Sequence, residues 1–129
     1  MCGVVGVVGP GVDASMLRAG IGAIRHRGPD GEGVFVDPAR VAGLAHARLA
    51  LVGIADGAQP IASEDGRVVV SVNGEIYGHA ALRAELEARG HRFRTHSDSE
   101  VALHLYEEHG DAFVEHLRGE LAMVLWDGA

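Results

Sequence analysis

The sequence has few of several features that mark whole classes of protein. It contains one cysteine, which excludes an internal disulfide framework and any Cys-x-x-Cys pair that would hold zinc. Basic residues number 11 against 18 acidic ones, and the resulting charge of −7 argues against binding to nucleic acid or to anionic membrane surfaces. The lack of disulfides also favours a reducing compartment, and we expect a cytoplasmic protein whose partner is a small molecule or another protein.

Targeting and membrane-spanning signals are equally scarce. The apolar opening MCGVVGVVG lacks a basic region and soon meets Pro10 and Asp13, so it resembles neither a signal peptide nor a membrane span. Hydrophobic residues make up 47% of the chain and charged residues 22%, which is typical of a folded globular protein. A length of 129 residues fits one domain.

Nucleotide and metal motifs are also missing. The glycines at 9–11 and 20–22 do not complete a dinucleotide or P-loop fingerprint. None of the eight histidines belongs to an HExxH motif, and His104 and His109 are five positions apart rather than four. We therefore predict no metal site.

Apolar periodicity and turn signals predict a mixture of helices and strands, an α+β fold. The predicted strands cover 2–8, 33–36, 41–51, 67–72, 91–95 and 121–126. The first helix is capped by Asp13 and ends before Pro29, and later helices cover 80–89 and 111–117. Between these two, Ser97-x-x-Glu100 is typical of a capping box for a helix that ends at Gly110.

Two strands suggest that the sheet continues beyond this chain. The run 2–8 is apolar almost without alternation, which predicts a strand covered on both faces. The strand 121–126 is followed by Asp127-Gly128, a hairpin turn signal, yet no second strand follows. Because an unpaired edge leaves hydrogen bonds unmade, we expect the chain to be part of a larger domain.

Cys2 is the first candidate for chemistry. If Met1 is removed, one residue carries both a thiol and a free α-amine. An α-amine has an ordinary pKa of about 7.7 to 8.0, so it can act as a general base near neutral pH where a lysine is almost fully charged. Nucleophile and base are then held together by covalent geometry. The alternative is a small buried cysteine in an apolar strand.

The remaining candidates suit acyl transfer on an amino acid. Asn73 and Gly74 follow an apolar strand and can form an oxyanion hole from a side-chain amide and an unobstructed N–H; the alternative is a two-residue hairpin turn. Arg48 can bind an α-carboxylate through two hydrogen bonds, and Glu75 and Asp98 can bind an α-ammonium. The alternative for the acids is a solvated charge or, for Asp98, a helix-terminal acid.

Taken together, these motifs resemble the N-terminal glutaminase domain of glutamine-hydrolysing asparagine synthetases, a class II, N-terminal-nucleophile glutamine amidotransferase. The resemblance runs from the first residue to about Trp126. Its motifs, in chain order, are MCG at 1–3, RHRGPDGEG at 25–33, HARLAL at 46–51, QP at 59–60, VNGEIYGH at 72–79 and GHRFRTHSDSEVALHLYEEHG at 90–110. One departure is Gly78, which stands where the family commonly has Asn.

The resemblance implies a fold and roles for individual residues. The fold is the four-layer αββα sandwich of N-terminal-nucleophile hydrolases, truncated here before its last strands, with 1–129 as a partial type 2 amidotransferase domain and the synthetase domain absent. Cys2 is the implied nucleophile, and Asn73 with Gly74 the implied oxyanion pair. The implied glutamine-binding residues are Arg48, Leu49, Leu51, Glu75 and Asp98.

Three hypotheses for function remain open. The first is hydrolysis of L-glutamine to glutamate and ammonia, with ammonia used for ATP-dependent asparagine synthesis from aspartate. The second is a fragment of an enzyme that amidates another carboxylate, and the third is a non-catalytic remnant. The resemblance implies no cofactor in this domain, with ATP and magnesium only in a synthetase domain or partner protein that receives the ammonia. It leaves a homodimer open.

Overall fold

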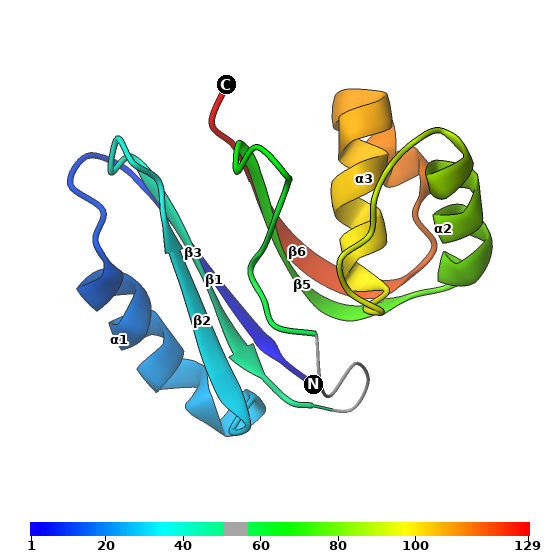
Figure 1. Ribbon diagram of the computed structural model, residues 1–129. Helices are drawn as coiled ribbons and strands as arrows, with labels where there is room; N and C mark the ends of the chain where they lie inside the picture. The colour runs from blue at the N-terminus through cyan, green and yellow to red at the C-terminus, as the bar shows by residue number, and fades with distance from the viewer. Residues whose placement is uncertain (51–56) are drawn as a thin grey trace.

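The computed structural model describes residues 1–50 and 57–129, which form four layers (Figure 1). The strands are β1 (Gly3–Val8), β2 (Gly31–Val36), β3 (Ala42–Arg48), β4 (Ile61–Ala62), β5 (Val68–Ile76) and β6 (Gly119–Asp127). The helices are α1 (Ala14–Ile24), α2 (His79–Ala88) and α3 (Ser99–His109), with the short 3-10 helices η1 (Arg25–Arg27) and η2 (Gly110–His116).

Two antiparallel sheets form the middle layers. The first sheet has the order β1-β3-β2, and the second has the order β4-β5-β6. Helix α1 covers the outer face of the first sheet, and α2 and α3 cover the outer face of the second (Figure 1). This arrangement confirms the predicted α+β fold and its αββα layers.

The period-2 alternation of strand residues decides what faces the space between the sheets. On β3, Ala45 and Ala47 pack with α1, so the intervening His46 points the other way, toward the second sheet. On β5 the residues Val68, Val70 and Val72 pack toward α3, so Ser71 faces the first sheet. The contact between His46 Nδ1 and Ser71 Oγ, 2.9 Å long, joins these two inner faces.

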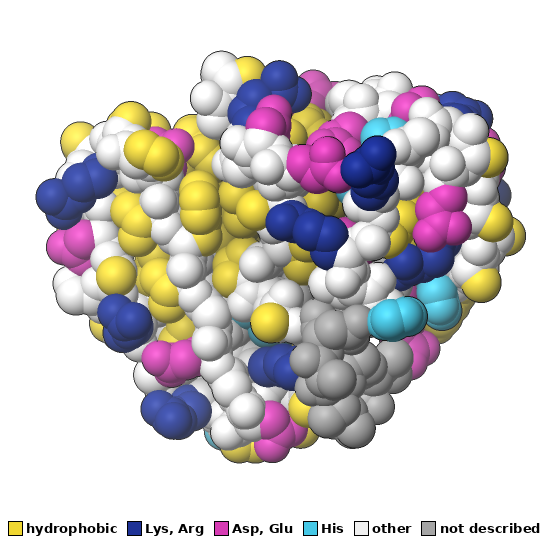
Figure 2. All heavy atoms as spheres, in the orientation of Figure 1, with side chains coloured by type: hydrophobic (Ala, Val, Ile, Leu, Met, Phe, Trp, Pro, Cys, Tyr) yellow, Lys and Arg dark blue, Asp and Glu magenta, His cyan; other side chains and the backbone are white. Residues whose placement is uncertain are grey.

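Each sheet has its own hydrophobic core on its helix-covered side. The core of the first sheet contains the buried residues Leu17, Ile21, Ala45 and Ala47. The core of the second is larger and contains Ile61, Val68, Val70, Val72, Ile76, Leu86, Val101, Ala102, Leu103, Leu105 and Phe113. On the face seen in Figure 2, hydrophobic side chains also gather over the first sheet and its boundary with the second.

Several predicted elements are confirmed at slightly different bounds. Asp13 caps α1 as expected, because its carboxylate accepts hydrogen bonds from the N–H groups of Ser15 and Met16. The strand predicted at 41–51 is β3, and it ends at Arg48. The strand predicted at 67–72 is β5, which continues to Ile76. The two-residue strand β4 was not predicted, because two residues are too few to show alternation.

Two predictions about the segment before α3 are wrong. Residues 91–95 form no strand, because a side chain takes the place of a partner strand. The carboxylate of Glu100 accepts hydrogen bonds from Arg94 N and Thr95 N, both about as short as backbone ladder bonds at 2.8 and 2.7 Å. Since Glu100 is used in this way, it does not reach back to Ser97, and the predicted capping box is absent from this helix start.

The first strand is also less buried than predicted. β1 lies at one edge of its sheet, and Val8 is 80% exposed. Its apolar run therefore does not indicate a strand covered on both faces throughout. Among residues 1–50 and 57–129, no helix is long and apolar enough to cross a membrane.

Candidate active site

The predicted site residues come together at one end of the space between the two sheets. A cavity of about 580 Å³ lies there. Its lining includes every predicted site residue that the structure describes, namely Cys2, Arg48, Leu49, Asn73, Gly74, Glu75 and Asp98. Leu51, the eighth predicted residue, lies outside the described residues. Residues from four separate segments of the sequence thus share one cavity.

Cys2 reaches the cavity because of the register of β1. Gly3 pairs with Ala47, so Cys2 lies one step further along the strand, beside Arg48 and Leu49 at the end of β3. The Leu49 N–H donates to Cys2 Sγ at 3.3 Å, and Cys2 Sγ lies 3.6 Å from Leu49 O. The guanidinium of Arg27 donates through Nε to Cys2 O at 3.1 Å. The sulfur and the backbone of Cys2 are therefore both held in place.

The loop after α1 holds the end of β3 that carries Arg48. Asp30 N donates to Arg48 O at 2.9 Å, and the Asp30 carboxylate accepts from Ala50 N at 2.9 Å. Gly28 passes so close to β3 that a Cβ there would overlap the carbonyl of Ala47. This close approach explains why the tight loop needs glycine at position 28.

Asn73 and Gly74 do not form a hairpin turn, because both lie inside β5 and pair with Ala122 and Leu121 of β6. Gly74 has φ +138°, and a Cβ there would overlap the carbonyl of Glu120. The backbone can take this course only with glycine. The structure thus removes the hairpin alternative and places the pair in the wall of the cavity that Cys2 also lines.

The two acidic residues differ in how they are held. Glu75 follows Gly74 in β5 and is exposed. Asp98 precedes α3, and its Oδ2 atom accepts a hydrogen bond from Ile76 N at 2.8 Å. Asp98 is the N-cap residue of α3, so the helix-terminal position is confirmed, although its side chain makes no capping hydrogen bond to that helix.

Sequence reasoning missed the role of Gln59, which fixes β5 next to Asn73. Its side-chain amide pairs with the backbone of Val72: Val72 N donates to Oε1 at 2.6 Å, and Nε2 donates to Val72 O at 2.9 Å. Nε2 also donates to Ser99 Oγ at 3.3 Å. Gln59 belongs to the QP motif at 59–60, but nothing in the sequence indicates which strand its side chain contacts.

His46 was also missed. It lines the cavity, is 1% exposed and has its Nε2 atom without a hydrogen-bond partner among the described residues. Burial, together with the smaller effect of the positive charge of Arg48, lowers the pKa of His46 to about 4. At neutral pH the imidazole is therefore uncharged.

Gly78 lines the cavity and is the N-cap residue of α2. Its φ of +69° lies in the left-handed region, which glycine adopts freely and asparagine more readily than other residues. The substitution of Gly for the Asn that the resembled family commonly has is therefore compatible with the same backbone.

Comparisons with known proteins agree with this geometry. A family model described as a glutamine amidotransferase domain matches residues 1–129. A probable glutamine-hydrolysing asparagine synthetase of Dictyostelium discoideum is 45% identical over 98% of this chain and 23% of that protein. The glutamine-hydrolysing asparagine synthetase 3 of Arabidopsis thaliana is 47% identical over 98% of this chain and 22% of that protein. The chain thus spans less than a quarter of the length of these relatives.

A solved structure has the same fold. It is the glutamine phosphoribosylpyrophosphate amidotransferase from B. subtilis, complexed with ADP and GMP. The TM-score is 0.77 at 20% sequence identity, and the match covers 99% of this chain and 35% of that one. At this identity the likeness concerns the fold alone.

Proposed function

The chain belongs to the glutamine amidotransferase domain family, and we propose that it hydrolyses L-glutamine to glutamate and ammonia at Cys2. The observation that carries the proposal is that Cys2, Asn73 and Gly74 line one cavity. A nucleophile beside donors for a developing negative charge is the minimum arrangement for acyl transfer.

Removal of Met1, which is 72% exposed, must precede the reaction. The freed α-amine of Cys2 takes the thiol proton while the sulfur attacks the side-chain amide carbon of glutamine. The negative oxygen that develops is stabilised by the Asn73 amide and the Gly74 N–H. The amine returns the proton to the leaving nitrogen, ammonia departs and a glutamyl thioester remains on Cys2. Water then adds to the thioester carbon, which releases glutamate and restores the thiol.

The substrate is held at its amino-acid end. Arg48 binds the α-carboxylate of glutamine, assisted by the neighbouring backbone of Leu49 and Leu51. Glu75 and Asp98 Oδ1 bind the α-ammonium, since Asp98 Oδ2 is already bonded to the protein backbone. These three charged side chains line the same cavity as Cys2, which supports the selection of a free amino acid.

We also propose that the ammonia supplies asparagine synthesis from aspartate in a synthetase domain or partner protein that uses ATP and magnesium. The support is the identity of about 45% to proteins named glutamine-hydrolysing asparagine synthetases. The test combines this chain with such a relative whose own N-terminal cysteine is replaced. Asparagine formed from glutamine and aspartate supports the proposal, and amidation of another carboxylate in preference to aspartate contradicts it.

The hydrolysis is tested with the purified 129-residue chain. Glutamate release from glutamine is expected in wild type and absent in Cys2→Ala, with both proteins unfolding at the same temperature. A glutamine analogue that carries an electrophile should add its mass to Cys2 alone. Turnover that survives Cys2→Ala would contradict the assignment.

A second variant separates the amine from the thiol. A chain with a permanent N-terminal extension before Cys2 keeps the sulfur but turns its α-amine into an amide. We expect this chain to lose hydrolysis although its thiol still reacts with a general alkylating reagent. Mass spectrometry of the intact wild-type protein establishes that Met1 has been removed. Full activity of the extended chain would rule out the α-amine as base.

A further inference from the structure

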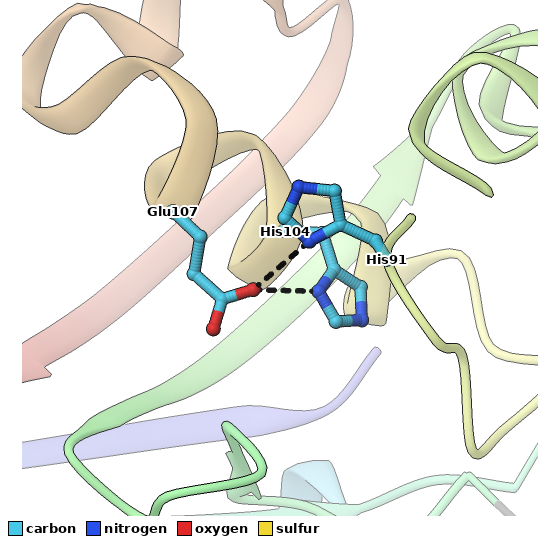
Figure 3. A group of neighbouring side chains, drawn as sticks. All are labelled: His91, His104 and Glu107. Carbon is cyan, nitrogen blue, oxygen red and sulfur yellow. Dashed lines mark hydrogen bonds and ion pairs between the residues drawn. The ribbon is translucent and has the colours of Figure 1, made fainter. Parts of the chain in front are cut away.

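A cluster of histidines and acids lies on the outer side of the second sheet, and none of its members lines the cavity. His104 and Glu107 are one turn apart on α3, and His91 follows α2. Figure 3 shows the three side chains pointing toward one another. One potential ligand atom from each lies within 4.8 Å of the other two.

Helix geometry and a helix end bring the three together. His104 and Glu107 are at positions i and i+3 of α3, which share one face of a helix. At the end of α2, Gly90 has φ +103°, and His91 N donates to Leu86 O at 3.1 Å. This closing turn, typical of helix C-termini, fixes the backbone of His91 beside α3.

The two histidines turn the same ring nitrogen toward one carboxylate oxygen. Glu107 Oε2 lies 2.7 Å from His104 Nδ1 and 3.3 Å from His91 Nδ1. The rings of His91 and His104 are 5.0 Å apart between centroids, and Phe93 packs edge-on against His104 at 4.5 Å. Three donor atoms thus converge on one point from two elements.

The other ring nitrogen of each histidine faces a separate carboxylate. His91 Nε2 lies 2.7 Å from Glu108 Oε1, and Glu108 is held in turn by Arg89 at 3.1 Å. His104 Nε2 lies 3.6 Å from Glu100 Oε1, which is within ion-pair reach, but this nitrogen has no hydrogen-bond partner among the described residues. In metal sites, a ligating histidine almost always gives its second N–H to an outer carboxylate, which sets its orientation, and His91 with Glu108 matches this pattern.

We propose that His91 Nδ1, His104 Nδ1 and Glu107 Oε2 bind a divalent transition-metal ion, with zinc as the best match. Two imidazoles and one carboxylate are a donor set of zinc sites, whereas magnesium and calcium prefer oxygen ligands alone. The metal takes the place of the protons that the two Nδ1 atoms share with Glu107. Water would fill the fourth position, since Glu107 is exposed.

The distances suit zinc with small adjustments. Ligand atoms at about 2.0 to 2.2 Å from a tetrahedral zinc are about 3.3 to 3.6 Å from one another. The Glu107–His91 pair already has this separation, and the Glu107–His104 pair, at 2.7 Å, must open slightly. Bound metal would join the connection after α2 to α3, so its effect is structural and separate from glutamine hydrolysis.

The test uses the metal-stripped 129-residue chain with Cys2→Ser, so that the thiol cannot bind the metal. Calorimetric titration with zinc chloride should show one site, and zinc should raise the melting temperature. Cobalt(II) should give the strong visible absorption of a four-coordinate site. His91→Gln and Glu107→Gln should each weaken zinc binding at least about tenfold, and Glu108→Gln by about ten- to a hundredfold.

The matched control is the stacked pair His109 and His116, whose rings are 3.8 Å apart on neighbouring segments. His109→Gln and His116→Gln should leave zinc affinity unchanged. Because His91 and Glu107 are only partly buried, their variants should fold like the parent, which circular dichroism checks. No zinc binding by the folded parent, binding that His91→Gln does not weaken, or equal losses in the control variants would overturn the proposal.

Discussion

The two halves of the molecule contribute unequally to the cavity between them. The first half, α1 with β1, β2 and β3, carries Cys2 and Arg48 and has four buried residues in its core. The second half, β4 to β6 with α2 and α3, carries Asn73, Gly74 and Asp98 and has eleven. The proposed nucleophile, Cys2, therefore lies on the half with the smaller core, where hydrogen bonds from Arg27 and Leu49 hold it. The proposed oxyanion pair lies on the half with the larger core.

The largest effect is expected for Gly74→Ala in the second half. The new Cβ meets the backbone carbonyl of Glu120, which cannot move without breaking the β5–β6 pairing, and φ +138° adds strain. We expect a loss of more than about 3 kcal/mol in the free energy of unfolding, together with loss of glutamine hydrolysis. Urea unfolding followed by circular dichroism measures the loss.

Gly6→Ala is the matched change in the first half. Its Cβ would lie 2.9 Å from Val124 Cγ1, a side-chain atom that can turn away. We expect a cost of only about 1 to 2 kcal/mol. If Gly74→Ala unfolded at the same urea concentration as Gly6→Ala, the backbone of β5 and β6 would be able to move away from the new Cβ, and the expected difference between the two changes would be wrong.

The next effect compares one buried leucine from each core. Leu103 in the second half and Leu17 in the first are 1% and 0% exposed. Leucine-to-alanine changes at such positions cost about 2 to 5 kcal/mol, depending on how far the surroundings collapse. We expect Leu103→Ala to cost about 1 kcal/mol more than Leu17→Ala, because more residues surround it in a larger core. Thermal and urea unfolding of both variants decide this, and the reverse order would show that the smaller core is the more rigid one.

A smaller effect is expected for Glu100→Gln, which tests how the second half positions Asp98. Glu100 is fully buried and accepts hydrogen bonds from the backbone of Arg94 and Thr95. Glutamine keeps one oxygen but turns an NH₂ group toward these donors, so we expect a loss of about 2 to 3 kcal/mol at pH 7. The KM for glutamine should rise because the segment leading to Asp98 is loosened.

The control for Glu100→Gln is Glu87→Gln, since Glu87 is exposed on α2. Its unfolding midpoint and KM should equal those of wild type. Equal stability of the two variants would mean that the carboxylate of Glu100 is not needed to hold the 94–95 segment.

The last effect concerns how stability depends on pH, and it depends on His46, which contacts Ser71 between the two sheets. Burial and, to a smaller extent, the positive charge of Arg48 together lower the pKa of His46 from 6.5 to about 4. The unfolded chain therefore binds a proton at higher pH than the folded one, so this stability is present above pH 6.5 and is lost as the pH falls toward 4. The contribution to the slope is at most about 1.4 kcal/mol per pH unit.

His46→Gln should flatten this dependence. Urea unfolding at several pH values between 7 and 4 should show a smaller loss of stability on acidification than in wild type, whereas His109→Gln should follow wild type. An unchanged slope in His46→Gln would mean that the imidazole takes up its proton without unfolding.

Much of the candidate site could be predicted from local patterns. The position of Cys2 behind Met1 and the Asn73-Gly74 pair after an apolar strand are visible in the sequence, and the described members of the predicted set share one cavity. Asn73-Gly74 forms no hairpin turn, because the pairing of both residues with β6 outweighs the local preference of this dipeptide for a turn. The predictions of no metal and no cofactor stay predictions, and the zinc proposal goes against the first of them.

What the sequence determined by itself is local: helix starts such as Asp13, alternation along strands and glycines where the backbone turns. Only the tertiary structure decided which side chains contact residues of other elements. Arg27 donates a hydrogen bond to the backbone of Cys2. The side chain of Gln59 pairs with the backbone of Val72, and the ring of His91 packs against that of His104. Periodicity reports the face on which a side chain lies, but the neighbour opposite that face depends on how two sheets and their helices pack to bury their apolar sides.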